Sequence, residues 1–476
     1  MPDRFAPLLG TTLVVYVVLA FGLSFWARGR IASAEDYVVA GRRLPLSLAW
    51  ATLFATWFGA GTLLTATDEV RSHGLELAAL DPFGAGVCLL LAGWFFATRL
   101  WKLELLTLAD FYGRRFGPRA ELVAAVVMIP GYFGWIAAQF VALAGVLELF
   151  FGIDPTLGIA LVAGVGAGYT LIGGMWSVTL TDAAQMVGIV VGLVVLSGAV
   201  LLELGDGAAG AGAVRLLDET PPAMWTVVPT ETLAAFTAWL GVFCAGALGN
   251  LPGQDLAQRI FAARSAVVAK RACLVAGVLY LAVGLLPLLL GLAGNLLVPN
   301  HEQAILPLLA SLFLSPALAV VFLVTVLSAV LSTIDSAILS PASVLGRNLL
   351  GRIPQRRVSP LRLQEFSVVI VTACSLAFAY AGEDAYSLLE LAYEIGLVGL
   401  LVPLAVGLYS ARGGEPAALA SMIVGTLAWA AHLGLGWETF LDLGPPMGLS
   451  CAGLGVLAYG AFAFAPRGES RLRPQV

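Results

Sequence analysis

Thirteen long apolar runs occupy most of the chain and constrain its fold more than any other sequence feature. Most contain about 20 residues, the length that crosses the hydrocarbon core of a bilayer as an α-helix. We expect helices because lipid offers no hydrogen-bond partner to an exposed backbone. The runs cover approximately residues 8–27, 45–66, 76–99, 120–150, 156–174, 176–204, 231–252, 268–294, 315–340, 363–381, 385–409, 415–435 and 445–465.

The composition also indicates a membrane protein. Hydrophobic residues make up 59% of the chain and charged residues 12%, whereas a soluble domain is about half apolar and a quarter charged. We therefore predict an all-α polytopic membrane protein with 13 transmembrane helices in contact with the lipid bilayer. The chain contains no GxxxxGK[ST] motif, which argues against ATP-driven pumping by this chain alone. Nothing in the sequence points to a nucleic-acid partner.

The basic residues predict the orientation in the membrane. The segments expected on one side are 28–44, 98–121, 259–271, 346–363, 410–413 and 466–476. Of the 25 Lys and Arg residues, only Arg4, Arg71 and Arg215 lie elsewhere. Because short basic loops stay in the cytoplasm, we expect a multi-pass protein of the cell (inner) membrane. Its N-terminus should lie outside and its C-terminus in the cytoplasm.

Two of the runs contain internal helix breakers. The second carries Gly59 and Gly61 near its middle, and the seventh carries GALGNLPG (246–253). Gly and Pro interrupt helical hydrogen bonding and expose carbonyl and amide groups at the middle of the membrane. Breaks at matching positions in two halves are typical of inverted-repeat secondary transporters. The alternative is close helix packing through small residues.

This interpretation divides the chain into a core and peripheral parts. We expect the core to be two five-helix groups related as a 5+5 inverted repeat. The predicted divisions are 1–44 (peripheral first helix and cytoplasmic loop), 45–204 (first repeat), 205–230 (extracellular loop), 231–409 (second repeat) and 410–476 (two peripheral helices and cytoplasmic tail).

The ninth run ends in LSAVLSTIDSAILSPAS (327–343), which is rich in hydroxyl groups. Ala329, Ser332, Thr333 and Ser336 recur at three- and four-residue spacing and therefore share one helix face. Hydroxyls and bared carbonyls supply the neutral oxygens that a hard monovalent cation needs. Asp335 stands beside this face, and an ionisable residue inside a membrane is costly and usually functional. The alternative is that the hydroxyls bond their own helix and that Asp335 lies in water.

Four segments make the chain resemble the sodium:solute symporter family, which includes transporters of sugars, proline, sialic acid and choline. The resemblance covers about residues 35 to 410 and is highly specific. It implies thirteen spans around a LeuT-like core. The four segments are AGRRLPLSLAWATLFATWFGAG, YTLIGGMWSVTLTDAAQ, GNLPGQDLAQRIFAARS and LSAVLSTIDSAILSPASVLGRN.

The resemblance also implies where sodium binds. The conserved-type site would use the main-chain carbonyls of Ala55, Phe58 and Ala329 and the hydroxyls of Ser332 and Thr333. Some members bind a second sodium ion, for which the matching positions are Asp182, Ser332, Asp335 and Ser336. The alternative role for Asp182 is a helix N-cap.

Aromatic residues beside the break in the second run predict the solute pocket. Trp57 lies at the break, and Tyr132 and Trp135 lie on the fourth run. Their faces suit an organic cation such as choline, a sugar ring or an apolar amine. The choline-transporter branch looks closest within the family, and Trp57 and Trp135 match its aromatic cage. Gly253 and Ala85 depart from that branch, which carries a tryptophan and a tyrosine there.

Polar residues complete the predicted pocket. Asp81 places a carboxylate in the third run and favours an amine, although a polar residue in a water-filled vestibule is the alternative. Gln139, Gln254 and Gln258 are expected to hydrogen-bond a polar solute, and Gly253 also belongs to the predicted pocket. Arg259 is expected to begin the cytoplasmic basic loop.

We therefore predict a sodium-coupled symporter that imports a small organic solute, such as a quaternary ammonium compound or another amine, by alternating access. The alternatives are a sodium-coupled symporter for a sugar, amino acid or monocarboxylate, a proton-coupled carrier, and a solute sensor that does not transport. An enzyme is not expected, because His73, His301 and His432 are scattered and no catalytic group accompanies them. The sequence does not define the solute, the Na⁺:solute ratio or the oligomeric state.

Overall fold

The computed structural model describes residues 6–29, 31, 33–299, 304–352, 359–381 and 385–463, and this part of the chain is helical with no β-strand. Eleven helices are long and apolar enough to cross a membrane, or twelve if a bent pair is counted as one further span. The all-α polytopic prediction is therefore confirmed, while the count of thirteen stays a prediction. Residues 353–358 of the basic loop and the tail at 466–476 lie outside the described residues.

The helices follow one another with short connections. The first half contains α1 (Ala6–Arg28), α2 (Ala34–Val39), α3 (Leu46–Trp57), α4 (Ala66–His73), α5 (Ala85–Leu91), α6 (Ala97–Trp101), α7 (Leu108–Arg115), α8 (Pro118–Phe151), α9 (Pro155–Leu204) and α10 (Ala209–Glu219). The second half contains α11 (Leu233–Gly249), α12 (Gln254–Ala262), α13 (Ala266–Leu297), α14 (Ile305–Phe313), α15 (Pro316–Val344), α16 (Pro360–Ala379), α17 (Ala385–Ile395), α18 (Leu401–Tyr409), α19 (Glu415–Leu435) and α20 (Met447–Ala463).

The predicted break in the second apolar run is confirmed. Helix α3 ends at Trp57, and Phe58 leaves the helical conformation with φ −80° and ψ 61°. The chain resumes as the π-helical turn η3 (Gly61–Thr65) and then α4, bent by 55° from α3. The bend frees main-chain groups at its centre from the helical ladder.

The predicted break in the seventh run is also present. Helix α11 ends at Gly249, and α12 begins at Gln254 after the short segment 250–253. Pro252 lies in this segment, where its missing N–H costs no helical hydrogen bond. The two broken spans therefore interrupt their helices where the glycines and proline indicated.

Helix α9 joins two predicted spans, 156–174 and 176–204, without a loop. The turn between them is at Gly174, whose φ of 52° is left-handed. A Cβ atom there would come within 2.7 Å of the Tyr37 ring and 2.9 Å of its carbonyl oxygen. Glycine is required because both the backbone conformation and the close approach exclude a side chain.

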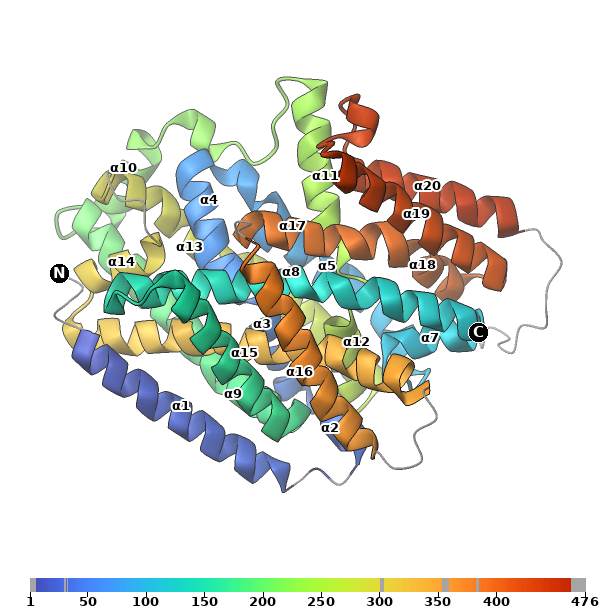
Figure 1. Ribbon diagram of the computed structural model, residues 1–476. Helices are drawn as coiled ribbons and strands as arrows, with labels where there is room; N and C mark the ends of the chain where they lie inside the picture. The colour runs from blue at the N-terminus through green and yellow to red at the C-terminus, as the bar shows by residue number, and fades with distance from the viewer. Residues whose placement is uncertain are drawn as a thin grey trace.

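Some of the short helices lie at two opposite ends of the bundle. Figure 1 shows α10 and α14 at one end and α7 at the other. Helix α10 lies within segment 205–230, so this stretch is a short helix with flanking loops, stabilised by the helix formers of AVRLLDE (213–219). Helix α1 lies along one edge of the bundle and exposes apolar side chains such as Val18 (64%) and Leu19 (66%). A face of this kind is suited to lipid.

Candidate sodium and solute site

The hydroxyl of Thr333 connects the break in α3 to helix α15. Its Oγ1 lies 3.3 Å from the carbonyl oxygen of Ala55 and 3.1 Å from that of Ala329. Ala55 precedes the break by one turn, and all three residues are buried. Carbonyls from two helices and one hydroxyl therefore converge in a dry region, which is the set of neutral oxygens that an alkali cation requires.

Glycine at the break permits this approach. A Cβ atom on Gly59 would lie 2.5 Å from Thr333 Oγ1 and 2.9 Å from Gln139 Oε1. Gln139, on α8, accepts a hydrogen bond of 2.9 Å from the main-chain N–H of Ala60. Gln139 therefore satisfies an amide that the break leaves without a helical partner, and it supports the backbone rather than facing an open pocket.

Asp182 connects α9 to both elements of the candidate sodium site. Its carboxylate accepts hydrogen bonds from Thr52 on α3 and from Ser332 on α15, and the carboxylate is fully buried. It lies within the second part of α9, well after the turn at Gly174, rather than at a helix N-terminus, so the alternative role as an N-cap is wrong. Asp182 therefore fixes Ser332 beside Thr333 in the candidate site.

The remaining residues of the predicted second sodium site lie one turn further along α15. Ser336 accepts a hydrogen bond of 2.6 Å from a guanidinium nitrogen of Arg259. Asp335 is also buried, and its Oδ1 atom has no hydrogen-bond partner among the described residues. The alternative in which Asp335 lies in water is therefore wrong. A buried carboxylate oxygen without a donor is available to a cation.

Arg259 was expected to begin the cytoplasmic basic loop, and the structure corrects this. Only 1% of the residue is exposed, because α12 lies in the interior against α3 and α15. Its guanidinium acts electrostatically on Asp182, Asp255 and Asp335. The buried polar region therefore contains a cation of its own.

A carboxylate that the sequence analysis did not select organises the aromatic residues. Asp255, the second residue of α12, accepts a hydrogen bond of 2.5 Å from the indole of Trp57 and one of 2.6 Å from the hydroxyl of Tyr132. The rings of Tyr132 and Trp135 lie 5.9 Å apart between centroids. Two aromatic donors thus hold a carboxylate between the two broken spans.

These residues border a small cavity. Its volume is about 40 Å³, which is enough for a water molecule but far below the several hundred Å³ of a typical ligand site. Of the predicted pocket residues, Tyr132, Trp135 and Gly253 line it, together with Asp255. Trp57 reaches this group through its bond to Asp255, and the neighbouring polar residues at the cavity are Asn250 and Tyr393.

Besides Trp57 and Gln139, two more predicted solute ligands lie away from the cavity lining. The side-chain oxygen of Gln254 accepts a hydrogen bond of 2.6 Å from the N–H of Leu108, at the start of α7. Asp81 lies in the π-helical turn η5 (Leu80–Gly84) and bonds Thr62 and Tyr280. Successive residues of a helix point about 100° apart, so Gln254 and Asp255 face different neighbours.

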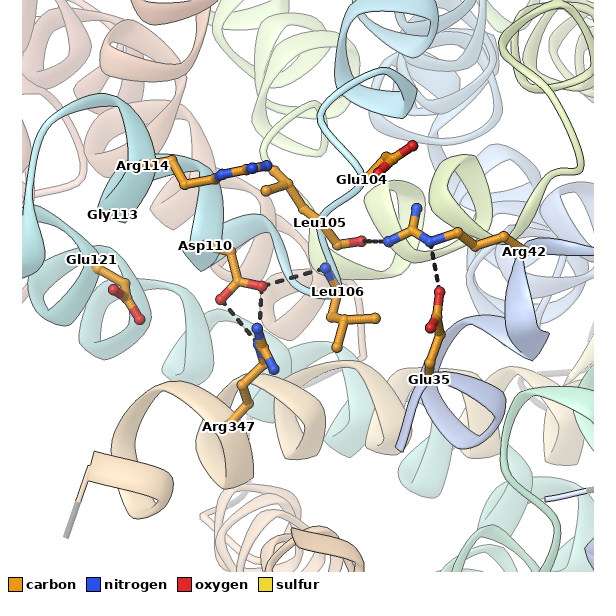
Figure 2. Close-up of a pocket in the computed structure, with 10 residues that line it drawn as sticks. All are labelled: Glu35, Arg42, Glu104, Leu105, Leu106, Asp110, Gly113, Arg114, Glu121 and Arg347. Atoms are coloured by element: carbon orange, nitrogen blue, oxygen red, sulfur yellow. Dashed lines mark hydrogen bonds and ion pairs between the residues drawn. The ribbon is translucent and has the colours of Figure 1, made fainter. Parts of the chain in front are cut away.

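A much larger cavity, of about 880 Å³, lies among charged residues beside α7. Figure 2 shows Arg347 turned toward Asp110 and Arg42 turned toward Glu35. The Arg347–Asp110 pair is 2.9 Å long, and the Arg42–Glu35 pair is 2.8 Å long. None of the predicted sodium or solute ligands lines this cavity, so its size alone does not make it the transport site.

Comparison with known proteins also indicates a transporter. The model of the sodium:solute symporter family matches residues 37–425. The high affinity choline transporter 1 of Homo sapiens is 27% identical over 413 residues, covering 80% of this chain and 69% of that protein. The sodium/pantothenate symporter of Escherichia coli (strain K12) is 27% identical over 461 residues, covering 92% of this chain and 93% of that protein.

Solved structures share the architecture. A Na⁺-coupled sialic acid symporter in a substrate-bound outward-open state superposes with a TM-score of 0.75 at 20% identity, covering 96% of each chain. The crystal structure of MhsT in complex with L-phenylalanine gives a TM-score of 0.55 at 14% identity, covering 88% of this chain and 98% of that one. These likenesses show a LeuT-like fold. With its family model matching most of the sequence, the chain belongs to the sodium:solute symporter family.

Proposed function

We propose that the chain is a Na⁺-coupled symporter that imports a small organic solute by alternating access. The family assignment and the Na⁺-coupled structural relative support sodium as the coupling ion. The observation that carries the proposal is the position of Thr333 Oγ1, within 3.3 Å of carbonyl oxygens from both α3 and α15.

Sodium would bind where these groups converge. The ligands are the carbonyls of Ala55, Phe58 and Ala329 and the hydroxyls of Ser332 and Thr333. An ion at this point links the bent span to α15, so it favours the conformation in which the two are together. Solute bound beside the break favours the same conformation, and linkage then makes each ligand raise the affinity for the other. The membrane potential contributes about 2.3 kcal/mol per 100 mV for each charge that crosses fully.

A second cation site at Asp182, Asp335 and Ser336 is supported by the buried charges. If Asp182, Asp255 and Asp335 are all ionised, the single guanidinium of Arg259 neutralises only one of the three. A buried charge without a partner is strongly destabilising, so bound cations or protons must supply the balance. Asp335 is the carboxylate in this group with the clearest place for a cation, because its buried Oδ1 has no hydrogen-bond partner among the described residues.

The solute that this pocket suits best is a cationic or zwitterionic amine, and choline is the first candidate. Trp57, Tyr132 and Trp135 supply aromatic faces for an ammonium group, and Asp255 supplies a negative charge among them. The relative in Homo sapiens that transports choline with high affinity supports this assignment. Gly253 leaves the cage one aromatic ring smaller than that of the choline-transporter branch, and a Cβ atom there would lie 2.8 Å from both Asp255 Oδ1 and the Asn250 carbonyl oxygen.

A carboxylate such as pantothenate is the second candidate for the solute. The sodium/pantothenate symporter of Escherichia coli aligns over 92% of this chain. Asp255 would repel a carboxylate, so the charge of the preferred solute separates the two candidates. A sugar or amino acid is a further alternative, and a sensor that binds without transporting is the alternative class.

The cavity of about 40 Å³ must widen before a solute can enter. Widening requires movement of α8, α12, α17 or the break between α11 and α12, since these carry most of its lining residues. Alternating access supplies such a movement by rocking one group of helices against another. We assign these groups to 45–204 and 231–409, count α20 as the thirteenth span, and place the N-terminus outside and the C-terminus in the cytoplasm.

Uptake into proteoliposomes tests the proposal. The purified protein should accumulate choline or another amine under an inward Na⁺ gradient and not under a K⁺ gradient. A pH gradient alone should give no uptake. Binding of an amine without accumulation would indicate a sensor, and preference for pantothenate over choline would reverse the solute assignment.

A further inference from the structure

A second group of oxygens surrounds the break in the bent span, separate from those around Thr333. The hydroxyl of Tyr280 on α13 lies 2.9 Å from the carbonyl oxygen of Trp57, 2.9 Å from Asp81 Oδ1 and 2.6 Å from Thr62 Oγ1. Thr62 Oγ1 lies 2.9 Å from the same Asp81 oxygen. All four contacts are at hydrogen-bond distance.

This group is buried and lacks a compensating charge. Asp81 is 4% exposed, and Thr62 and Tyr280 are fully buried. No ion pair involves Asp81 among the described residues. The turn η5 packs against α5, α11, α13 and the preceding 3₁₀ turn. Tyr393 on α17 is also close enough to Asp81 for its hydroxyl to interact with the charge of the carboxylate. The titratable groups carried by the 3₁₀ turn, α5, α11 and α13 are Glu76, Cys88, Cys244, Lys270, Arg271, Cys273 and Tyr280.

Counting hydrogens shows that an ionised Asp81 leaves two of the four contacts without a hydrogen in any arrangement. The four contacts share only the two hydroxyl hydrogens of Thr62 and Tyr280. If both hydroxyls donate to a carboxylate, the 2.6 Å contact between them and the contact to the Trp57 carbonyl have no hydrogen. Two oxygens at that separation without a hydrogen repel each other, and burial makes the repulsion more costly.

One further hydrogen on Asp81 reduces the contacts without a hydrogen from two to one. The carboxyl O–H then donates to Thr62, the Thr62 hydroxyl donates to Tyr280, and the Tyr280 hydroxyl donates to the carbonyl of Trp57. This directed chain places a hydrogen in three of the four contacts. Only the contact between Tyr280 and Asp81 Oδ1, which closes the ring, remains without its own hydrogen.

We propose that Asp81, Thr62, Tyr280 and the Trp57 carbonyl form a proton-binding site, in which a proton held on Asp81 fixes the main chain at the break in the second span. On release, the carboxyl O–H bond breaks, its electron pair remains on the carboxylate, and the proton passes to water. Thr62 and Tyr280 then turn to donate to the carboxylate, and the carbonyl of Trp57 loses its donor.

The site is linked to both ligand sites through Trp57, whose carbonyl accepts the hydrogen bond from Tyr280. Trp57 lies between Ala55 and Phe58, whose carbonyls are the proposed sodium ligands, and its indole bonds Asp255. A change at Asp81 reaches the two sides of the break through two side chains, Tyr280 and Thr62. The inference does not depend on sodium coupling, because the hydrogen count concerns the protein alone.

Infrared spectroscopy of the purified full-length protein at neutral pH, without Na⁺ or solute, tests the site directly. A neutral carboxyl group has a C=O stretch that a carboxylate lacks. We expect the wild-type spectrum to contain such a band that is missing from Asp81→Asn, whose carboxamide replaces the neutral acid. Asp68→Asn is the matched control, since Asp68 lies on α4 of the bent span and accepts a hydrogen bond from the N–H of Ile305; it should retain the band.

Tyr280→Phe provides a second readout if Asp81→Asn does not fold. It keeps the carboxyl group but removes one oxygen from the chain, so the band should persist and shift in frequency. Identical carboxyl regions in wild type and Asp81→Asn would overturn the proposal. So would an unshifted band in Tyr280→Phe. Raising the pH should remove the band in wild type, whereas a band that persists at every pH would overturn the proposed release of the proton.

Discussion

Thr333→Val removes one ligand from the proposed sodium site while keeping the shape of the side chain. In the structure the hydroxyl lies 3.3 Å from the Ala55 carbonyl and 3.1 Å from the Ala329 carbonyl, and a methyl group would take its place. A polar contact to a charged group contributes about 1.5–3 kcal/mol, and about 1.4 kcal/mol corresponds to a factor of ten. We therefore expect the Na⁺ dissociation constant to rise about 10- to 150-fold.

Thermal unfolding of purified protein in mixtures of NaCl and KCl at constant ionic strength measures this change. An ion that binds only the native state stabilises it by RT ln(1 + [L]/Kd), about 2.7 kcal/mol at 100 times Kd. A 100-fold weaker site would leave about 0.4 kcal/mol at the same Na⁺ concentration. Because valine also loses the hydrogen bond to Ala329, the quantity compared is the Na⁺-dependent part of the stabilisation.

Ser343→Ala is the matched control for this experiment. Ser343 is buried on the same helix, and its hydroxyl donates to the carbonyl of Leu339 one turn earlier. Its removal should change the baseline stability without changing the Na⁺ dependence. If Thr333→Val kept the wild-type Na⁺ dependence, the assignment of sodium to this point would be refuted.

Further changes test the neighbouring features. Gly59→Ala should raise the Na⁺ concentration for half-maximal uptake at least as much as Thr333→Val does, because its Cβ would lie 2.5 Å from Thr333 Oγ1. An unchanged Na⁺ concentration for half-maximal uptake would contradict this and show that the break relaxes to accept a methyl group. Trp57→Phe should weaken solute binding more than sodium binding, since it removes the 2.5 Å bond to Asp255; calorimetry showing equal losses would indicate a structural tryptophan. Asp255→Asn should reduce the affinity for a cationic solute about tenfold or more and leave a neutral sugar unaffected, which competition binding measures.

The sequence predicted the parts of the fold that follow from local chemistry. Apolar run length located the spans, and glycine and proline located both breaks, because each of these depends on the residue itself and its immediate neighbours. The pairing of the α3 break with the hydroxyl face of α15 came from the family resemblance, and the structure brings Ala55 and Thr333 together.

The sequence did not predict which way α12 is turned. Whether Gln254, Asp255 or Arg259 faces the interior depends on the rotation and depth of a nine-residue helix, and neighbouring helices set both. A signal was nevertheless present. Asp255 and Arg259 are four residues apart directly after a predicted break, and two opposite charges on one face inside an apolar bundle are better explained by a buried network than by a cytoplasmic loop.

Tyr280 was missed for a different reason. It lies alone in a long apolar run, where a tyrosine is an ordinary packing residue, and only the tertiary structure brings it to Asp81 and Thr62. No pattern within α13 marks it. Contacts between residues more than 190 positions apart, such as Tyr280 to Asp81 at 199, are set by how the two halves meet.

The hydrogen bond from Ser332 to Asp182 determines which side of the serine oxygen faces an approaching ion. A hydroxyl has a single hydrogen, and Ser332 directs its own into the carboxylate. Only lone pairs are then left to point toward the α3 carbonyls, so the oxygen is oriented as an acceptor before sodium arrives. Asp182 thus sets the polarity of a neighbouring group without having to touch the ion itself.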